Sequence, residues 1–242
     1  MKYNIITTSD STYYYFLKIL INSILKNCDM TKISDIIVVD TGLTEQQVEE
    51  IKSKTTQVRF IHTEKKTNFK GGIWGEDWQE NVKGKTEYLA KVVKELKEPV
   101  LMLDSDMMVL RDLYVLLEKG GDIQVCHRPK HEVTYIGSYF FSINHEKSIP
   151  FIESWAELTK SGKGFVPHES PALVATVKKN ESMLKIVRLD QAAVNVLDPQ
   201  FITDQTLIIH FKGNIVSNSI EESINARVHK RGWTNYINLY LD

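Results

Sequence analysis

Two aspartates, one residue apart, are the part of this sequence best suited to chemistry. Asp104 and Asp106 directly follow the apolar run Val100–Leu103, which is typical of a strand covered on both faces. In an extended segment, side chains two residues apart point the same way, so both carboxylates can converge on one cation while Ser105 faces away. Carboxylate oxygens suit Mn²⁺ or Mg²⁺, and such an ion can neutralise a departing diphosphate. Alone the motif is weak, because roughly one Asp-x-Asp is expected by chance, and a solvated loop is the alternative.

The elements before this pair alternate between strands and helices. A capping box, with Thr44 as the cap and Gln47 bonding back, predicts that one helix begins at about Glu45. Such alternation favours a largely parallel sheet, whose ligands gather beyond the carboxyl ends of its strands. The predicted strands are Tyr3–Thr8, Ile36–Val39, Arg59–His62 and Val100–Leu103, and apolar stripes predict further helices over Leu17–Leu25 and Leu89–Leu96.

The second half of the chain has a mixed pattern. Trp155 falls on the apolar stripe of its helix, which indicates a core position. We expect strands at Ile123–Cys126, Tyr139–Ile143 and Leu207–His210, and helices over Phe151–Leu158 and Ala193–Leu197.

Composition excludes several classes of function. The chain has 242 residues, 42% of them hydrophobic, and 30 basic against 31 acidic residues give a net charge of -1. This balance argues against nucleic acid as a partner. Cys28 and Cys126 form no zinc or disulfide pattern, which favours a reducing compartment. No apolar run approaches the about 20 residues of a membrane span, and the start lacks a signal-peptide pattern. We therefore expect a soluble, cytoplasmic protein.

The position of Asp104-Ser105-Asp106 resembles the metal motif of GT-A glycosyltransferases, and the nearest match is glycosyltransferase family 8. Ile5-Ile6-Thr7-Thr8-Ser9-Asp10, followed by Tyr13, is similar to the family segment that holds the nucleotide base. Lys91 occupies the place of the family's basic residue on the helix before the metal strand. Asp190-Gln191 resembles a segment beside the reacting sugar, and His210-Phe211-Lys212-Gly213 resembles the late motif whose histidine is the third metal ligand.

The chain departs from the family pattern in two places. Gly137–Asn144 resembles a family strand that ends in Asn, but Gly137 and Tyr139 replace the Asn and Gly usual near its start. Asn214-Ile215-Val216 stands where the family has a Lys-Pro-Trp that grips the diphosphate. Lys212 is the candidate substitute for that lysine.

The resemblance implies an α/β GT-A fold with a mostly parallel sheet, in one domain over residues 1–242. Residues 1–110 would form the nucleotide-sugar half and 111–242 the acceptor half. It implies a metal-dependent enzyme that moves a hexose from a nucleotide sugar to a glycan or other hydroxyl acceptor with retention. A UDP-sugar is the implied donor, because uridine diphosphate is the commonest carrier among the families that the chain resembles. The implied metal ligands are Asp104, Asp106 and His210, the implied nucleotide-sugar contacts are Thr8, Asp10, Tyr13, Lys91, Asp104, Ser105, Lys212 and Gly213, and the implied catalytic pair is Asp190 and Gln191.

Ordinary structural roles compete with several of these assignments. Asp10 and Asp190 each precede a helix and could cap it, and Lys91 lies off the apolar face of its helix, where a solvated lysine is common. His210 could be a structural histidine at the end of its strand. Gly71–Trp78 could form a lid or simply pack. Gly84-Lys85-Thr86 is similar to the end of a phosphate-binding loop, but position 79 is Gln79 and no apolar strand precedes it, so we exclude that loop.

Two other functions remain open at this level. A nucleotidyltransferase that forms sugar nucleotides should have a glycine-rich loop after the first strand, whereas this chain reads Ser9-Asp10-Ser11-Thr12 and has no glycine before Gly42. A non-catalytic nucleotide or glycan binder that keeps the fold would explain the missing Lys-Pro-Trp. The binder predicts affinity without turnover.

Overall fold

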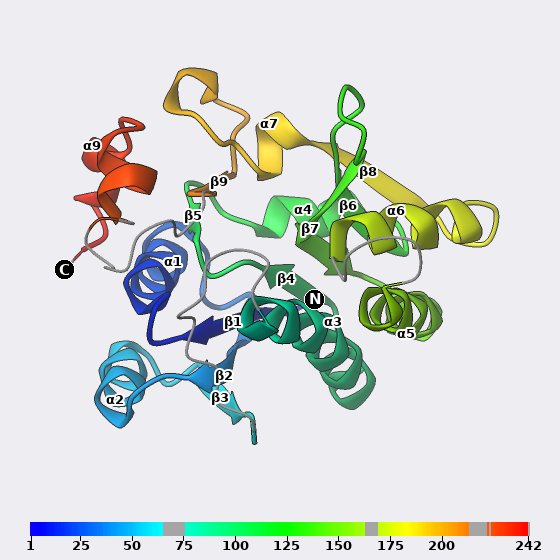
Figure 1. The fold of residues 1–242 in the computed structure, drawn as a ribbon, viewed down its shortest axis with the longest axis horizontal. Coiled ribbons are helices and arrows are strands. Elements are labelled where there is room, and N and C mark those ends of the chain that lie inside the picture. The colour runs from blue at the N-terminus through cyan, green and yellow to red at the C-terminus, as the bar shows by residue number, and fades with distance from the viewer. Residues whose placement is uncertain (65–75, 163–168, 213–221, 223, 242) are drawn as a thin grey trace.

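A central β-sheet with helices on both faces organises the protein (Figure 1). The computed structural model describes residues 1–64, 76–162, 169–212, 222 and 224–241. Within these residues a seven-stranded sheet has the order β3-β2-β1-β4-β7-β6-β8. Its strands are β1 (Tyr3–Asp10), β2 (Ile33–Gly42), β3 (Val58–His62), β4 (Val100–Leu103), β6 (Ile123–His127), β7 (Tyr135–Ser142) and β8 (Ile186–Asp190).

The sheet is mostly parallel, as predicted. Strand β1 pairs in parallel with β2 and β4, β2 with β3, and β6 with β8. Strand β7 alone runs against its neighbours β4 and β6 in this sheet. The carboxyl ends of β1, β2 and β4 therefore meet at one edge, which is where a parallel sheet collects ligands.

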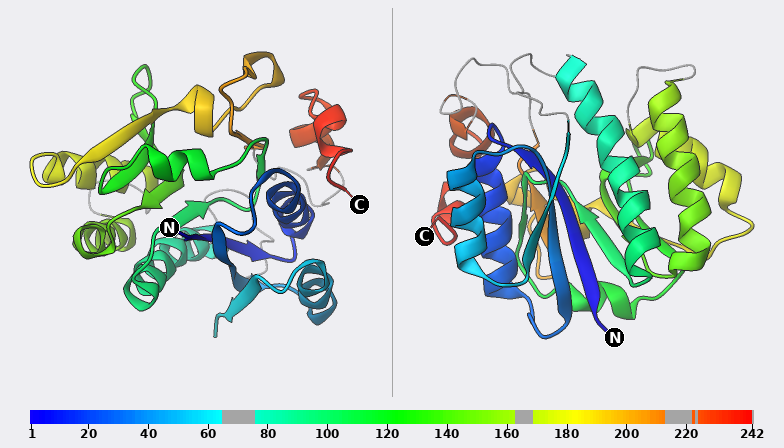
Figure 2. Two further views of the ribbon diagram at one scale, coloured as in Figure 1. Left: turned by 180° about the vertical axis from the view of Figure 1, so that it is seen from behind. Right: turned by 90° about the horizontal axis from the view of Figure 1, so that it is seen from below.

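Two helical layers bury the faces of the sheet (Figure 2). On one face lie α1 (Tyr14–Asn27), α2 (Glu45–Lys54) and α4 (Tyr114–Glu118), and on the other lie α3 (Glu76–Leu96), α5 (His145–Ser161) and α6 (Glu169–Asn180). Helix α2 begins with the predicted capping box, because Thr44 accepts from the Gln47 backbone while the Gln47 side chain accepts from the Thr44 backbone. Trp155 is fully buried in the second layer, which confirms its core assignment.

A small antiparallel ribbon stands beside the carboxyl edge of the sheet. Strand β5 (Met107–Val109) pairs with β9 (Ile208–His210), and Met107 lies opposite His210. The chain reaches β5 from β4 through a turn at Ser105 and Asp106. This ribbon therefore places the residues just before β5 next to the end of β9. The short α7 (Gln191–Val194) and the 3-10 turn Pro199–Phe201 lie between β8 and β9.

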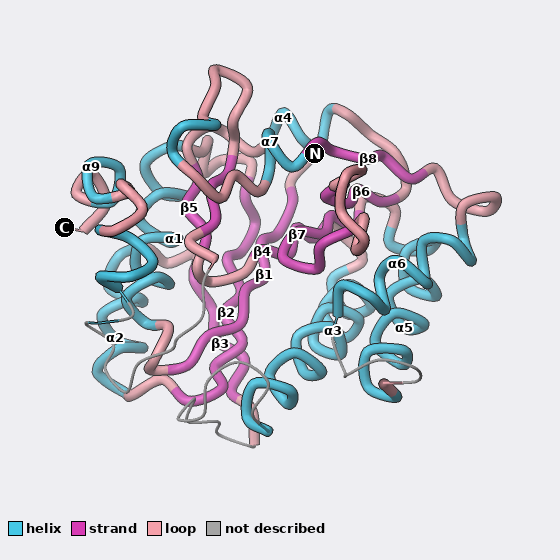
Figure 3. The backbone as a smooth tube through the Cα atoms, turned by 45° about the horizontal axis from the view of Figure 1, so that its top comes forward, coloured by secondary structure: helices cyan, strands magenta, loops and turns pink. Residues whose placement is uncertain are grey.

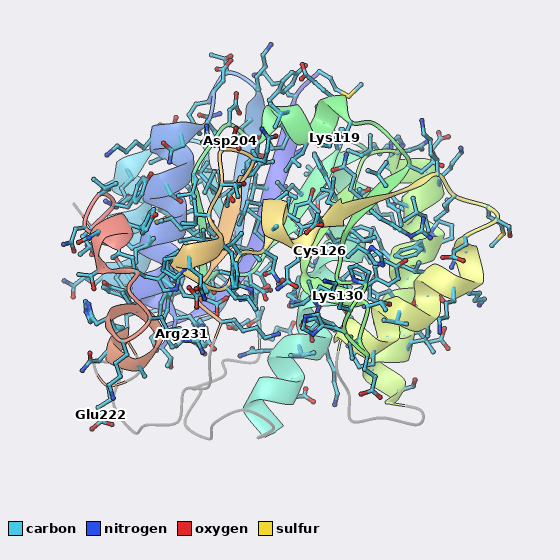
Figure 4. The ribbon with its side chains drawn as sticks, turned by 90° about the horizontal axis from the view of Figure 1, so that it is seen from above. Lys119, Cys126, Lys130, Asp204, Glu222 and Arg231 are labelled. Carbon is cyan, nitrogen blue, oxygen red and sulfur yellow. The ribbon has the colours of Figure 1, made fainter. Side chains whose placement is uncertain are left out.

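The C-terminal segment, residues 224–241, packs against α1 (Figure 3). It contains a π-helical turn, Asn225–His229, and α9 (Thr234–Ile237). Trp233 lies edge-on to Phe211, with ring centroids 5.8 Å apart, and the Asn22 side chain donates to the Tyr240 carbonyl at 2.8 Å. Helix α1 and the C-terminal segment thus share one small core.

Most elements predicted from the sequence are present, with three differences. Strands β5 and β8 and helices α4, α6 and α9 were not predicted, and the helix expected over Ala193–Leu197 is the single turn of α7. Asp104–Asp106 does not continue as an extended strand but forms a turn. No helix among the described residues is both long and apolar enough to cross a lipid bilayer.

Candidate functional site

Asp104, Asp106 and His210 converge beyond the carboxyl end of β4. One side-chain donor atom from each lies within 4.8 Å of the others. The Asp104 backbone N–H donates to the Ser138 carbonyl at 3.1 Å, and the Phe211 N–H donates to the Asp106 carbonyl at 2.9 Å. These bonds fix the turn to β7 and to the end of β9. The two carboxylates therefore meet through this turn rather than through the predicted extended backbone.

His210 presents one nitrogen to this cluster. Its Nδ1 lies 2.7 Å from Asn195 Oδ1, and its Nε2 lies 3.1 Å from Asp106 Oδ1. When Nδ1–H donates to the Asn195 oxygen, Nε2 keeps its lone pair and faces a carboxylate oxygen. Two lone pairs at this separation require a cation between them, either a proton or a metal ion. Asn195 is fully buried and orients the imidazole from behind.

Lys85 is the basic residue that α3 delivers to the cluster. Its ammonium donates to Asp104 Oδ1 at 2.8 Å, to the Gly137 carbonyl at 3.0 Å and to Glu169 Oε1 at 3.3 Å. Burial opposes the charge, but Asp104 and Glu169 outweigh it and raise the pKa of Lys85. Lys91, the lysine proposed from the sequence, is exposed on the same helix.

Glu169 approaches the cluster because Gly137 leaves room for it. A Cβ placed on Gly137 would lie 2.2 Å from Glu169 Cγ. The Trp155 indole donates to the Glu169 carbonyl at 2.7 Å, which anchors the start of α6. The glycine that departs from the family pattern thus permits a buried Lys85–Glu169 pair.

Arg227 brings a second cation from the C-terminal segment. Its Nη2 contacts Asp106 Oδ2, and its Nε donates to the Phe211 carbonyl at 2.7 Å. The guanidinium lies 4.4 Å from the ring centroid of Phe16 and 5.3 Å from that of Tyr13. An arginine in such contacts stays charged.

The pKa values of the two aspartates are shifted in opposite directions. Burial raises the pKa of the Asp104 carboxyl more than Lys85 lowers it, and Asp106 adds to the rise. Burial also disfavours ionised Asp106, but His210 and Arg227 prevail and hold its pKa well below the usual value. Asp106 is therefore firmly ionised.

The residues proposed for the nucleotide lie at the end of β1. Asp10 Oδ1 accepts from the backbone N–H of Thr12 at 2.9 Å and of Tyr13 at 3.1 Å, which closes a turn before α1 and is not a helix cap. Its Oδ2 is buried and has no hydrogen-bond partner among the described residues. Tyr13 is the N-cap residue of α1, and Thr8 is half-buried in β1. Asp10 thus retains one acceptor oxygen that the fold does not use.

None of the remaining proposed residues that the structure describes belongs to the Asp104–Asp106–His210 cluster. Asp190 is exposed and caps α7, accepting from the Ala192 N–H at 2.8 Å, and Gln191 is half-buried. Ser105 is buried in the turn. Lys212 has an accessible side chain, and partial desolvation followed by Arg128 lowers its pKa. Gly213 and the possible lid Gly71–Gly75 lie outside the described residues, as does the side chain of Trp78.

Solved structures with the same architecture are glycosyltransferases. A galactosyltransferase, LgtC, in complex with donor and acceptor sugar analogs matches with a TM-score of 0.60 and 14% identity over 87% of each chain. An active-site mutant of LgtC, glutamine to glutamate, matches with a TM-score of 0.58 and 14% identity over 92% of this chain and 94% of its own. The chain has a GT-A fold.

A bifunctional glycosyltransferase, WbbM, in its apo form matches with a TM-score of 0.62 and 11% identity. The match covers 99% of this chain and 51% of WbbM. No protein-family model matches the sequence, and no curated protein matches it. At these identities the likeness defines the fold, whereas the chemistry has to be argued from the site.

The donor set fits a divalent cation. Two carboxylates and one imidazole supply oxygen and nitrogen ligands of the kind that Mn²⁺ accepts. The approach of His210 Nε2 to Asp106 Oδ1 at 3.1 Å is the contact that a cation would bridge. Mg²⁺, which prefers oxygen ligands, fits the two carboxylates and less well the imidazole.

Proposed function

We propose that this protein is a metal-dependent glycosyltransferase that transfers a hexose from a nucleotide sugar, a UDP-sugar, to a hydroxyl group of a glycan or other acceptor. The observation that carries the proposal is the convergence of Asp104, Asp106 and His210 at the carboxyl edge of a GT-A sheet. These three residues would hold Mn²⁺ or Mg²⁺. When bound, the ion supplies positive charge to the departing diphosphate.

The residues of the chain supply the other requirements of such a reaction. Asp10 Oδ2, buried without a hydrogen-bond partner among the described residues, is placed to accept an N–H from a nucleotide base. Thr8 and Tyr13 flank it in sequence and complete the proposed base site. Lys85 takes the role proposed for Lys91, because it is the lysine of α3 that contacts the ion-binding cluster. Lys212 and Gly213 would border the diphosphate.

Asp190 and Gln191 are the proposed residues beside the reacting sugar. Asp190 is the last residue of β8 and Gln191 the first of α7. Strand β8 pairs with β6 so that Asp190 lies opposite His127 at the carboxyl ends of both strands. The LgtC active-site mutant changes a glutamine of that enzyme, whereas the role proposed for Gln191 rests on the family 8 resemblance. Transfer with retention of configuration remains part of the proposal and rests on the family 8 resemblance.

Calorimetric titration with uridine diphosphate tests this proposal. We expect binding in the presence of Mn²⁺, loss of binding with chelator, and loss in the Asp104→Asn/Asp106→Asn double variant. Glu118→Gln, an exposed acid in α4, is the matched control and should bind as the parent protein does.

Turnover separates an enzyme from a binder. A screen of UDP-sugars should release uridine diphosphate in a metal-dependent way, and polarimetry or NMR of the product would report its anomeric configuration. Failure to bind any nucleoside diphosphate with metal would contradict the donor-site assignment. Metal-dependent binding without turnover of any sugar nucleotide would favour the non-catalytic alternative.

A further inference from the structure

Arg227 occupies one side of the proposed metal centre although it is distant in sequence from the metal motif. It is 1% exposed, and its Nη2 contacts Oδ2 of Asp106. Its Nε bond to the Phe211 carbonyl and its packing over Phe16 hold the guanidinium in place from two further directions. The arginine is therefore a fixed part of the site and not a mobile surface side chain.

This contact limits how Asp106 can bind an ion. Its Oδ2 is engaged by Arg227, so Oδ1, which faces His210 Nε2 at 3.1 Å, is the oxygen left for a metal ion. The carboxylate that binds the ion thus shares its charge with a permanent cation. An ion that arrives alone gains less from Asp106 than it would from an unshared carboxylate.

The formal charges around the site also disfavour a divalent ion that binds alone. Asp104, Asp106 and Glu169 face two buried cations, Lys85 and Arg227. Counted as formal charges and without His210, three carboxylates against two cations leave one negative charge. A divalent ion alone would turn this into an excess of positive charge in a buried site, which is costly. An ion accompanied by an anionic diphosphate would not.

We propose that Arg227 is a positioning residue that makes metal binding depend on the nucleotide. It orients Asp106 while weakening the affinity of the site for a bare divalent ion, so that ion and nucleoside diphosphate bind together. This inference rests on the proposed function, because it assumes that the same centre binds a nucleoside diphosphate. It assigns a role in that centre to the C-terminal segment.

The test is the affinity for Mn²⁺ with and without uridine diphosphate, measured from the electron paramagnetic resonance signal of free Mn²⁺. In the parent protein, we expect uridine diphosphate to tighten Mn²⁺ binding by about tenfold or more. In Arg227→Gln, Mn²⁺ alone should bind about tenfold more tightly, because a nearby positive charge has been removed. The effect of the nucleotide on Mn²⁺ affinity should shrink accordingly.

Two further variants keep the result interpretable. Arg227→Lys retains a cation and should keep the weak affinity for bare Mn²⁺, which a purely structural role of the arginine would not require. Lys230→Gln removes an exposed charge from the same segment and should behave as the parent protein. Far-ultraviolet circular dichroism and thermal melting identify any variant that does not fold.

The outcomes separate this inference from the proposed function. If the parent binds Mn²⁺ with uridine diphosphate but folded Arg227→Gln binds bare Mn²⁺ no more tightly, the inference alone is overturned. The same holds if Arg227→Lys tightens bare Mn²⁺ binding as much as Arg227→Gln. If the parent binds no Mn²⁺ even with uridine diphosphate, both the inference and the proposed metal centre are overturned.

Discussion

At the scale of single residues, the proposed site is a set of buried charges that depend on one another. Lys85 contacts both Asp104 and Glu169, and Arg227 contacts Asp106. Removing one member of a buried pair leaves its partner charged without compensation, which costs more than the pair itself contributes. Stability and ligand binding should therefore respond sharply to changes at these positions.

Lys85→Met tests this dependence. We expect it to lower the free energy of unfolding by about 3 kcal/mol at pH 7, because Asp104 and Glu169 lose their shared cation. Lys91→Met, an exposed change on the same helix, should stay within about 0.5 kcal/mol of the parent. Urea unfolding followed by circular dichroism measures both. Equal losses in the two variants would show that the Lys85 contacts are unimportant, and Lys85→Met/Glu169→Gln should recover part of the loss.

The pKa shifts of the two aspartates predict opposite behaviour with pH. The pKa of Asp106 is depressed in the folded protein, so its ionised form stabilises the fold above the unfolded pKa of about 3.9, and this contribution is lost as the pH falls below that value. The pKa of Asp104 is raised, so its effect on stability is most favourable at low pH and is lost as the pH rises through the folded pKa.

The Asp106→Asn variant should accordingly be destabilised at pH 7 by about 2 kcal/mol, since Arg227 loses its charged partner. Asp104→Asn should lower the free energy of unfolding clearly less than Asp106→Asn does. The gap between Asp106→Asn and the parent should narrow as the pH falls below about 4. Urea unfolding at a series of pH values measures these differences in the absence of metal. A gap that widens on acidification would contradict the assigned direction of the Asp106 shift.

The sequence revealed part of this charge set. The spacing of Asp104 and Asp106 predicted that they converge, although they meet through a turn, and His210 was identified by the resemblance of His210–Gly213 to a family motif. Lys85 and Arg227 could not be found in this way, because their roles depend on contacts with residues 19 and 121 positions away. Lys85 lay in a motif correctly excluded as a phosphate loop, and only the register of α3 against β4 shows its importance. The assignments of Asp190, Gln191, Thr8 and Tyr13 stay predictions.

At the scale of elements, the close approach of α6 to β7 positions Glu169. Gly137 lies in β7, and Glu169 is the first residue of α6. The lack of a side chain at Gly137 lets the Glu169 side chain pass over the strand to reach Lys85. This is a packing requirement, since the backbone of Gly137 is not left-handed.

Gly137→Ala and Gly84→Ala form a matched pair that tests this packing. The new Cβ at position 137 would lie 2.2 Å from Glu169 Cγ, so we expect a loss of about 1–3 kcal/mol in stability as α6 shifts. At position 84, in α3, the nearest atom is Tyr88 Cε2 at 3.9 Å, an ordinary contact. There alanine should stabilise the helix by up to about 1 kcal/mol. Thermal and urea unfolding measure the change in stability of both variants. If Gly137→Ala is as stable as the parent, Gly137 is not needed to make room for Glu169.

Helix α6 and strand β8 also show where prediction from sequence stops. The strand β8, Ile186–Asp190, is only partly buried at the edge of the sheet and includes an exposed Arg188, so it lacks the apolar run that identified β4. Edge strands pack on fewer neighbours and tolerate charge. The α2 capping box was predictable because both of its hydrogen bonds are local.

At the scale of the whole molecule, helix α1 and the C-terminal segment pack against each other although they are far apart in the sequence. Phe16 of α1, Phe211 after β9 and Trp233 of the C-terminal segment pack in one cluster. The Asn27 side chain donates to the Val109 carbonyl at 2.8 Å and to the Tyr240 hydroxyl at 2.7 Å, which ties α1 to β5 and to the C-terminal segment. The ribbon that positions His210 is therefore supported by α1 and by the C-terminal segment. No local sequence pattern predicts such a contact, because it joins residues more than 200 positions apart.

Trp233→Ala should weaken the packing of the C-terminal segment against the rest of the protein. The indole is fully buried against Phe211, so its removal leaves a cavity worth about 3 kcal/mol or more at the junction of the segment with β9. Hydrogen exchange followed by mass spectrometry should show faster exchange in residues 224–241 and 208–210, with β1 and β2 unchanged. Leu239→Ala, which truncates a side chain that is 58% exposed in the same segment, should leave exchange as it is in the parent.

Trp233→Ala also tests whether the packing of the C-terminal segment affects the metal centre. If the segment positions Asp106 through Arg227, Trp233→Ala should also raise the affinity for bare Mn²⁺ toward that of Arg227→Gln, because a loosened segment holds the guanidinium less firmly against the carboxylate. Faster exchange confined to 224–241, with Mn²⁺ affinity unchanged, would show that the segment covers the site without setting its charge. Faster exchange across β1 and β2 would instead mean that the segment supports the whole sheet, since loss of a local contact cannot otherwise expose strands at its centre.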